Sequence, residues 1–126
     1  MCYNNCKIKI ESCIDGCVNI VSATGTVDRT RSEVRFYYKL DGDECKLAVN
    51  ACQAEQSRRG EQNIQMTFRE GEQTECSLAS GGFSGKFTVF THKLIFCDGD
   101  VCKLFICYSL GEQKTELNFS AEEISR

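Results

Sequence analysis

Apolar and polar side chains alternate along much of this chain, and turns of acidic residue and glycine separate the alternating stretches. In residues 34–40 (VRFYYKL) every second side chain is apolar or aromatic, and residues 7–10 and 64–69 show the same period. A period of two places one side of an extended strand in a core and the other side in solvent. The pattern therefore predicts antiparallel strands with one buried face.

One turn sequence occurs twice. Residues 41–47 (DGDECKL) match residues 98–104 (DGDVCKL) at six of seven positions. Asp-Gly suits a two-residue hairpin turn, because glycine tolerates a positive φ and the aspartate side chain bonds nearby backbone. A Gly-Glu-Gln sequence follows each copy, so the clearest repeats are residues 34–68 and 87–119. This internal similarity predicts β-hairpins as the repeated unit.

The expected fold is all-β. Residues 87–96 and 102–110 are apolar on nearly both faces and are expected to pair as central strands. Residues 45–56 fit a strand by the repeat or a short helix by their alanines, and a helical turn is expected over residues 120–126. Seven or eight antiparallel strands in a single domain, residues 1–126, predict a disulfide-rich sandwich or small barrel.

Cysteine is unusually frequent in this chain of 126 residues, and the ten residues allow five disulfides. They are Cys2, Cys6, Cys13, Cys17, Cys45, Cys52, Cys76, Cys97, Cys102 and Cys107. The chain contains no Cys-x-x-Cys of the kind that zinc sites favour, and zinc or reduced structural thiols are the alternatives to disulfides. A disulfide framework predicts a secreted, extracellular protein, although its pairing does not follow from the sequence.

Several further features bear on location and partners. Asn118 begins an Asn-Phe-Ser glycosylation acceptor pattern. No signal-peptide pattern follows Met1, so a secreted protein would be present here in a mature or recombinant form, and whether Met1 is native is left open. No apolar run is long enough for a transmembrane segment. The net charge of −3 and the lack of a Lys/Arg block count against nucleic acid as a partner.

The first functional hypothesis is a secreted, non-enzymatic domain that binds another protein. Arg35, Tyr37 and Lys39 share the polar face of residues 34–40. Exposed aromatic and arginine side chains are frequent anchors of protein interfaces. An exposed sheet face or the hairpin ends are therefore the expected binding surface, and the oligomeric state is left open.

Two alternatives are kept. Arg58 and Arg59 lie in residues 54–61, a segment that reads as an exposed loop, and a stiff loop that presents arginine is a means of protease inhibition. The internal repeat and the absence of proline also fit a self-assembling extracellular structural or coat component.

The sequence offers little for catalysis. His92 is the only histidine, so any serine or cysteine nucleophile would depend on it. The acidic turns lack the regular series of acidic residues that a calcium-binding loop needs. A pair of carboxylates for glycoside hydrolysis is left open, because the distance between such carboxylates in space does not follow from the sequence. We therefore expect no enzyme activity, no metal and no cofactor.

Overall fold

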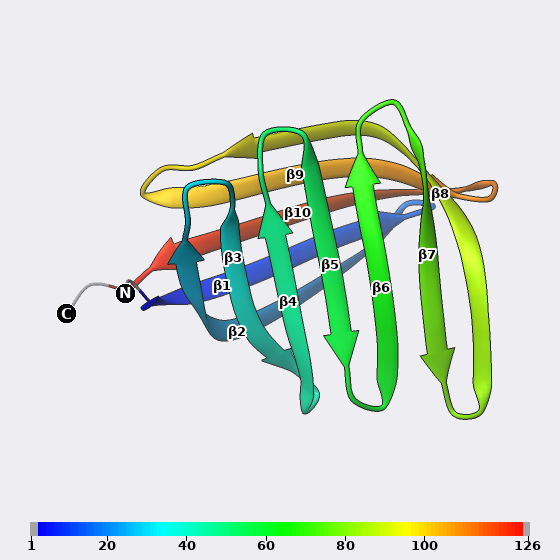
Figure 1. Ribbon diagram of the computed structural model, residues 1–126, viewed down its shortest axis with the longest axis horizontal. Coiled ribbons are helices and arrows are strands. Elements are labelled where there is room, and N and C mark those ends of the chain that lie inside the picture. The colour runs from blue at the N-terminus through cyan, green and yellow to red at the C-terminus, as the bar shows by residue number, and fades with distance from the viewer. Residues whose placement is uncertain (1–2, 125–126) are drawn as a thin grey trace.

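Ten antiparallel strands close into one barrel (Figure 1). The computed structural model describes residues 3–124. Each strand pairs with its neighbours in the chain, and β1 pairs with β10 to complete the ring. The strands are β1 (Tyr3–Ile14), β2 (Cys17–Arg29), β3 (Val34–Leu40), β4 (Asp43–Val49), β5 (Gln53–Arg59), β6 (Gln62–Arg69), β7 (Gln73–Ser80), β8 (Phe83–Cys97), β9 (Val101–Leu110) and β10 (Gln113–Glu123).

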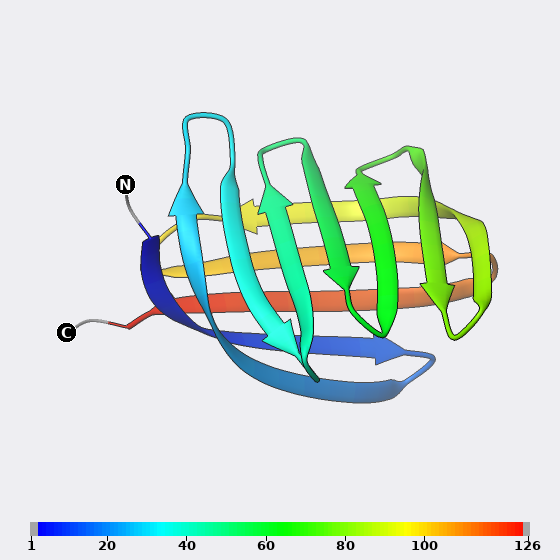
Figure 2. The ribbon, with the colours of Figure 1, turned by 60° about the horizontal axis from the view of Figure 1, so that its bottom comes forward.

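The barrel is flattened into two layers whose strands cross steeply (Figure 2). Strands β3 to β7 form one layer and β9, β10 and β1 the other, while the long strands β2 and β8 pass between them. β2 turns the corner at Gly25, where a Cβ atom would lie only 2.2 Å from the carbonyl oxygen of Tyr37. β8 turns with a bulge between Thr91 and Lys93. Glycine kinks and bulges are the usual devices for bending a strand.

The acidic-Gly turns are hairpin turns, as the repeat predicts. Asp41-Gly42 joins β3 to β4 with φ values of 50° and 84°, and Asp15-Gly16 joins β1 to β2 with 50° and 83°. Positive φ at both central residues is the type I′ geometry that matches strand twist. The second repeat copy also joins two strands, β8 and β9, but through the three residues 98–100, and neither Asp98 nor Gly99 has a positive φ.

The predicted inward faces are confirmed. Phe36 and Phe68 are fully buried, and the Phe36 ring packs 5.0 Å from that of Phe119. Ile8 and Met66 are also buried, in a core cluster to which β9 contributes Leu104 and Ile106. The pairing of β8 with β9 is confirmed as well, but β8 is not a central strand throughout, because residues 83–88 pair only with β7 and residues 93–97 only with β9.

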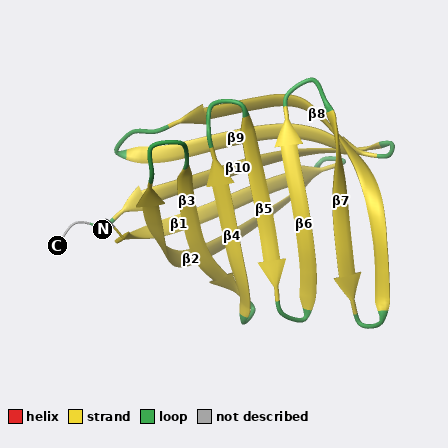
Figure 3. Cartoon of the chain, in the orientation of Figure 1, coloured by secondary structure: helices red, strands yellow, loops and turns green. Residues whose placement is uncertain are grey.

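The helical expectations are wrong for the described residues, which contain only strands and turns (Figure 3). The segment 45–56 belongs to β4 and β5 and the turn between them. Its alanines fit strands because the pleat directs Ala54 into the core and Ala48 to the outer face. Residues 120–123 are the end of β10: residues 120–122 pair with both β9 and β1, and Glu123 pairs with β1. Residues 125–126 of the expected turn lie outside the described residues. No helix within residues 3–124 is long and apolar enough to cross a membrane.

The disulfide framework does not form among the described residues, whose nine cysteines are all free; Cys2 lies outside them. Cys6, Cys45, Cys76 and Cys102 are buried in the core from four different strands. Burial raises the pKa of each of these thiols, and for Cys102 the value is about 11.

The strand register explains why cysteines on neighbouring strands do not pair. A disulfide needs Cα atoms within about 7 Å. In the register of residues 3–124, no cysteine lies opposite another. The cysteines that flank a tight turn, at 13 and 17 and at 97 and 102, point to opposite faces of their hairpins. Short sequence spacing across a turn therefore does not bring their sulfur atoms together.

Candidate functional site

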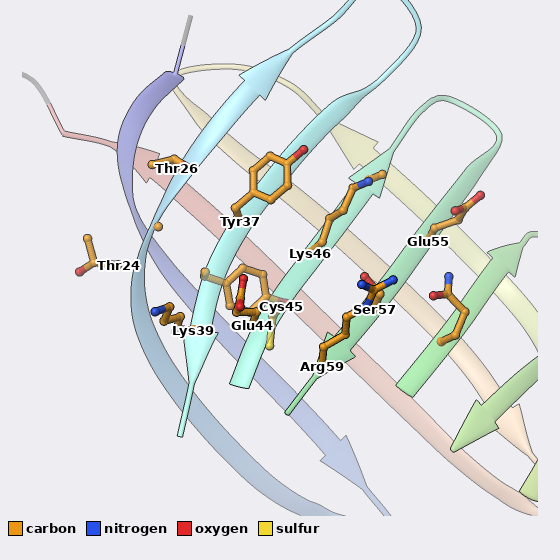
Figure 4. Close-up of a pocket in the computed structure, with 14 residues that line it drawn as sticks. Thr24, Thr26, Tyr37, Lys39, Glu44, Cys45, Lys46, Glu55, Ser57 and Arg59 are labelled. Carbon is orange, nitrogen blue, oxygen red and sulfur yellow. The ribbon is translucent and has the colours of Figure 1, made fainter. Parts of the chain in front are cut away.

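A hollow of about 680 Å³ lies on the outer face of β2 to β6 (Figure 4). We call it the outer groove. One row of its side chains crosses all five strands, because Thr26, Tyr37, Lys46, Ser57 and Gln65 are successive partners in the register. Each of these residues alternates with an inward neighbour, so their outward direction follows from the pleat.

The next row of the outer groove carries charge. Lys39 lies opposite Glu44, which in turn lies opposite Arg59. Within the described chain, no ion pair of 4.0 Å or less involves any of these three side chains or Lys46. The groove therefore presents cations and an anion that are free to meet a ligand.

The outer groove is deepest over a small side chain, that of Ala48. Ala48 of β4 lies between Arg35 of β3 and Glu55 of β5 in the register. Its methyl group leaves open space where larger side chains surround it. Arg35 points to the same outer face, but it forms an ion pair with Glu33 and does not line the hollow.

Arg58 and Arg59 differ in environment. They belong to strand β5, which pairs with β4 and β6, so the expected exposed loop at 54–61 is wrong. The inward residues of β5 include Gln56 and Arg58, which are polar, and this hides the strand period in the sequence. Arg59 points outward into the groove, whereas Arg58 faces inward.

Arg58 contributes to a buried polar contact at one mouth of the barrel. Its Nε donates to Asp43 Oδ2 at 2.8 Å, and the backbone N–H of Glu61 donates to Asp43 Oδ1 at 2.9 Å. The bond from Arg58, followed by that from Glu61, lowers the pKa of the Asp43 carboxyl below its usual value. The contact joins the β3–β4 hairpin to β5 and to the start of β6.

A second polar cluster lies where β2, β10 and the β8–β9 turn meet. Arg29 Nη1 donates to Glu123 Oε1 at 2.7 Å, and Nη2 donates to Asp98 Oδ1 at 3.2 Å. Hydrogen bonds from Arg29 are the main reason why the pKa values of both carboxyls are lowered. Cys102 Sγ donates to the same Asp98 oxygen at 3.1 Å. This cluster has its cation and anions paired, so it acts as a structural clasp.

The only histidine lies on the outer surface. His92 Nε2 is 2.7 Å from Ser109 Oγ, and the imidazole meets the Phe90 ring edge-on. A nucleophile and base in contact also need a third group that orients the base, and no hydrogen bond to His92 Nδ1 is found within residues 3–124. Those residues also hold no metal-ligating group of three or more side chains.

Three of the five residues singled out in the sequence come together. Tyr37, Lys39 and Arg59 line the outer groove, whereas Arg35 lies beside it and Arg58 points away. Sequence reasoning missed Lys46, Glu44 and Ser57. The strand alternative for residues 45–56 would have placed Lys46 outward, two residues after Glu44.

Asn118, the glycosylation candidate, is exposed on the outer face of β10. It lies opposite Glu11 of β1 and Phe105 of β9. The acceptor pattern is therefore in the middle of a strand that is paired on both sides.

Comparisons with known proteins extend only to the fold. No family model matches the chain, and no curated protein matches its sequence. The structure is similar to the crystal structure of the ywiB protein from Bacillus subtilis, with a TM-score of 0.84 over 98% of this chain and 94% of that one. The two sequences are 15% identical, so the likeness shows a shared barrel architecture and carries no activity.

Proposed function

We propose that the protein is a non-enzymatic binding module that recognises another protein through the outer groove. The observation that carries this proposal is the convergence of Tyr37, Lys39, Lys46 and Arg59 from three strands, with none of the three cations paired within the described chain. Tyrosine and arginine are enriched at the centres of protein interfaces. Glu44 adds an acceptor, so the groove suits a partner surface of mixed charge.

A protein partner fits this site better than an enclosed small molecule. Pockets for small ligands are concave and mostly apolar, and in barrels they lie in the mouth or interior. Here large side chains such as Phe36 and Phe68 fill the interior and are fully buried. The outer groove is open, carries polar and apolar surface in similar amounts and is formed on strands, which hold its side chains at fixed spacings.

The proposal is tested with an affinity capture followed by a direct binding measurement. The wild-type chain and the double variant Tyr37→Ala, Arg59→Ala are used as bait, and proteins retained only by the wild type are purified and titrated calorimetrically. We expect the double variant to weaken binding by about 30-fold or more, the effect of removing a central anchor. Shifted amide NMR signals should map to β3, β4 and β5.

Lys103→Ala is the matched control, because Lys103 is an exposed cation on the outer face of β9, in the other layer. It should bind as the wild type does. A partner whose affinity is equal for the wild type and the double variant would show that the outer groove is not the binding surface. Turnover of an ester, glycoside or peptide substrate by the pure chain would contradict a non-enzymatic function.

The two other hypotheses have less support. A substrate-like inhibitory loop needs an exposed arginine on a segment free of its neighbours, and Arg58 and Arg59 belong to a paired strand. The hypothesis that the protein is secreted rested mainly on disulfides. It loses that support because the nine described cysteines are free thiols. The proposed binding function rests on the outer groove alone. The hypothesis of self-assembly depends on whether a strand edge is open to a second chain.

A further inference from the structure

Half of β2 lacks a partner on one side. Residues 17–24 pair with β1 only, because pairing of β2 with β3 begins at Gly25. In Figure 2 this half of β2 forms the border of its layer, with no strand beyond it. Six of these eight residues are exposed, and Val18 and Ile20 are exposed by 58% and 54%. An unpaired edge offers a row of backbone N–H and C=O groups to an added strand.

The edge of β2 differs from the other open edges of the barrel. Within the described chain, two further stretches of β8 pair on one side only, the six residues 83–88 and the five residues 93–97. They carry Lys86 and Lys93, and charged side chains are a common protection against strand addition. The Leu94 N–H, in the second stretch, is also satisfied by Glu70 Oε1 at 2.9 Å. Residues 17–24 (CVNIVSAT) contain no charge and no proline.

We propose that residues 17–24 are a dimerisation edge, where a second copy of the chain adds its own β2 in antiparallel orientation. A pairing centred on Ile20 uses residues 17–23 of both copies and places Ile20 opposite its symmetry mate. Val18 then lies on the diagonal to Ile20 of the other copy, within contact distance for such side chains. The two exposed aliphatic pairs form one cluster on the outer face, and the layer of β9, β10 and β1 continues through β2 into the same layer of the second copy.

The neutrality of the edge argues for a second copy rather than another partner. A twofold axis brings the side chains nearest the axis close to their own symmetry mates, so a charged residue at the centre would meet a like charge. An edge that is neutral over eight residues avoids this repulsion. An edge built for a different protein gains from charges that complement that partner, and this edge has none.

The oligomeric state tests the proposal. Sedimentation velocity of the full chain from micromolar to near-millimolar concentration should show a reversible monomer–dimer equilibrium. Ile20→Lys, an outward and exposed position, should raise the dimer dissociation constant by at least about tenfold, because two ammonium groups then face each other. In hydrogen exchange, the amides of residues 17–24 should exchange more slowly at high concentration in the wild type only.

Ile95→Lys is the matched control, because Ile95 is 44% exposed on the outer face of β8, at an edge that already carries Lys93. It should leave the dimer intact, and circular dichroism should show that both variants are folded. A wild-type chain that stays monomeric throughout the range overturns the proposal. A dimer lost with Ile95→Lys but kept with Ile20→Lys also overturns it, as does a monomer that binds a synthetic strand of residues 16–26 without dimerising.

Discussion

At the scale of single residues, one carboxylate ties several segments together. Asp43 is buried and accepts hydrogen bonds from Arg58, from the Glu61 N–H and, at 3.4 Å, from the Gln62 N–H. We expect Asp43→Ala to lower the melting temperature by several degrees, because it leaves these donors without their acceptor. Thermal melts followed by circular dichroism measure this. Asp41→Asn, in the neighbouring turn, should melt as the wild type does, since asparagine also tolerates a positive φ.

The thiols give a second prediction at this scale. Native alkylation at mildly alkaline pH should label the exposed Cys17, Cys52 and Cys97 quickly. The four core thiols should react only on unfolding, because they are buried and burial raises their pKa values. Peptide mass mapping before and after denaturation separates the two groups. A denatured, unreduced sample that takes up no label would show that the cysteines are in disulfides after all.

At the scale of elements, the corner of β2 depends on a glycine. A Cβ atom at Gly25 would meet the Tyr37 carbonyl oxygen at 2.2 Å and Ile8 Cδ1 at 2.9 Å. We expect Gly25→Ala to destabilise the fold by about 2–4 kcal/mol, because neighbouring backbone must move. Chemical denaturation measures the loss. Gly99→Ala is the control, since its nearest contact would be 3.8 Å; equal losses in both variants would mean that the β2 corner is not a tight site.

The elements that the sequence predicts are those whose inner faces are apolar. β3 and β6 alternate clearly, and the Asp-Gly turns fix where β3 and β8 end. The sequence does not predict β5, because the polar residues Gln56 and Arg58 occupy inward positions. It does not predict residues 17–24 of β2 for the same reason, because Asn19 occupies an inward position there. Tyr37 and Lys39 were found from alternation within one strand. The residues that complete the outer groove come from the register between strands, which no local pattern records.

At the scale of the whole molecule, the Arg29 clasp makes stability depend on pH. The pKa values of Asp98 and Glu123 are lower in the folded than in the unfolded chain. Their contribution is therefore present above about pH 5 and is lost as the pH falls through the folded values. These side chains are about one-third exposed, so the contribution is about 1 kcal/mol or less.

Arg29→Gln is expected to remove this dependence. Its melting temperature should lie below that of the wild type at neutral pH, and the two curves should converge as the pH falls below the lowered folded pKa values, where the carboxyls are protonated in both states. Scanning calorimetry across this range provides the measurement. A constant difference between the two proteins at every pH would assign the role of Arg29 to packing instead of charge.

The seam between β1 and β10 sets the order in which the molecule can be completed. Residues 6–14 pair with residues 115–123, so β1 waits for β10, which is synthesised about a hundred residues later. Until then, β1 has an open edge on one side of its hairpin, and the neutral edge of β2 lies on the other. Exposed strand edges make incomplete chains prone to aggregate. A translation product that stops before β10 thus keeps both of these edges open, and the barrel closes only once β10 has been made.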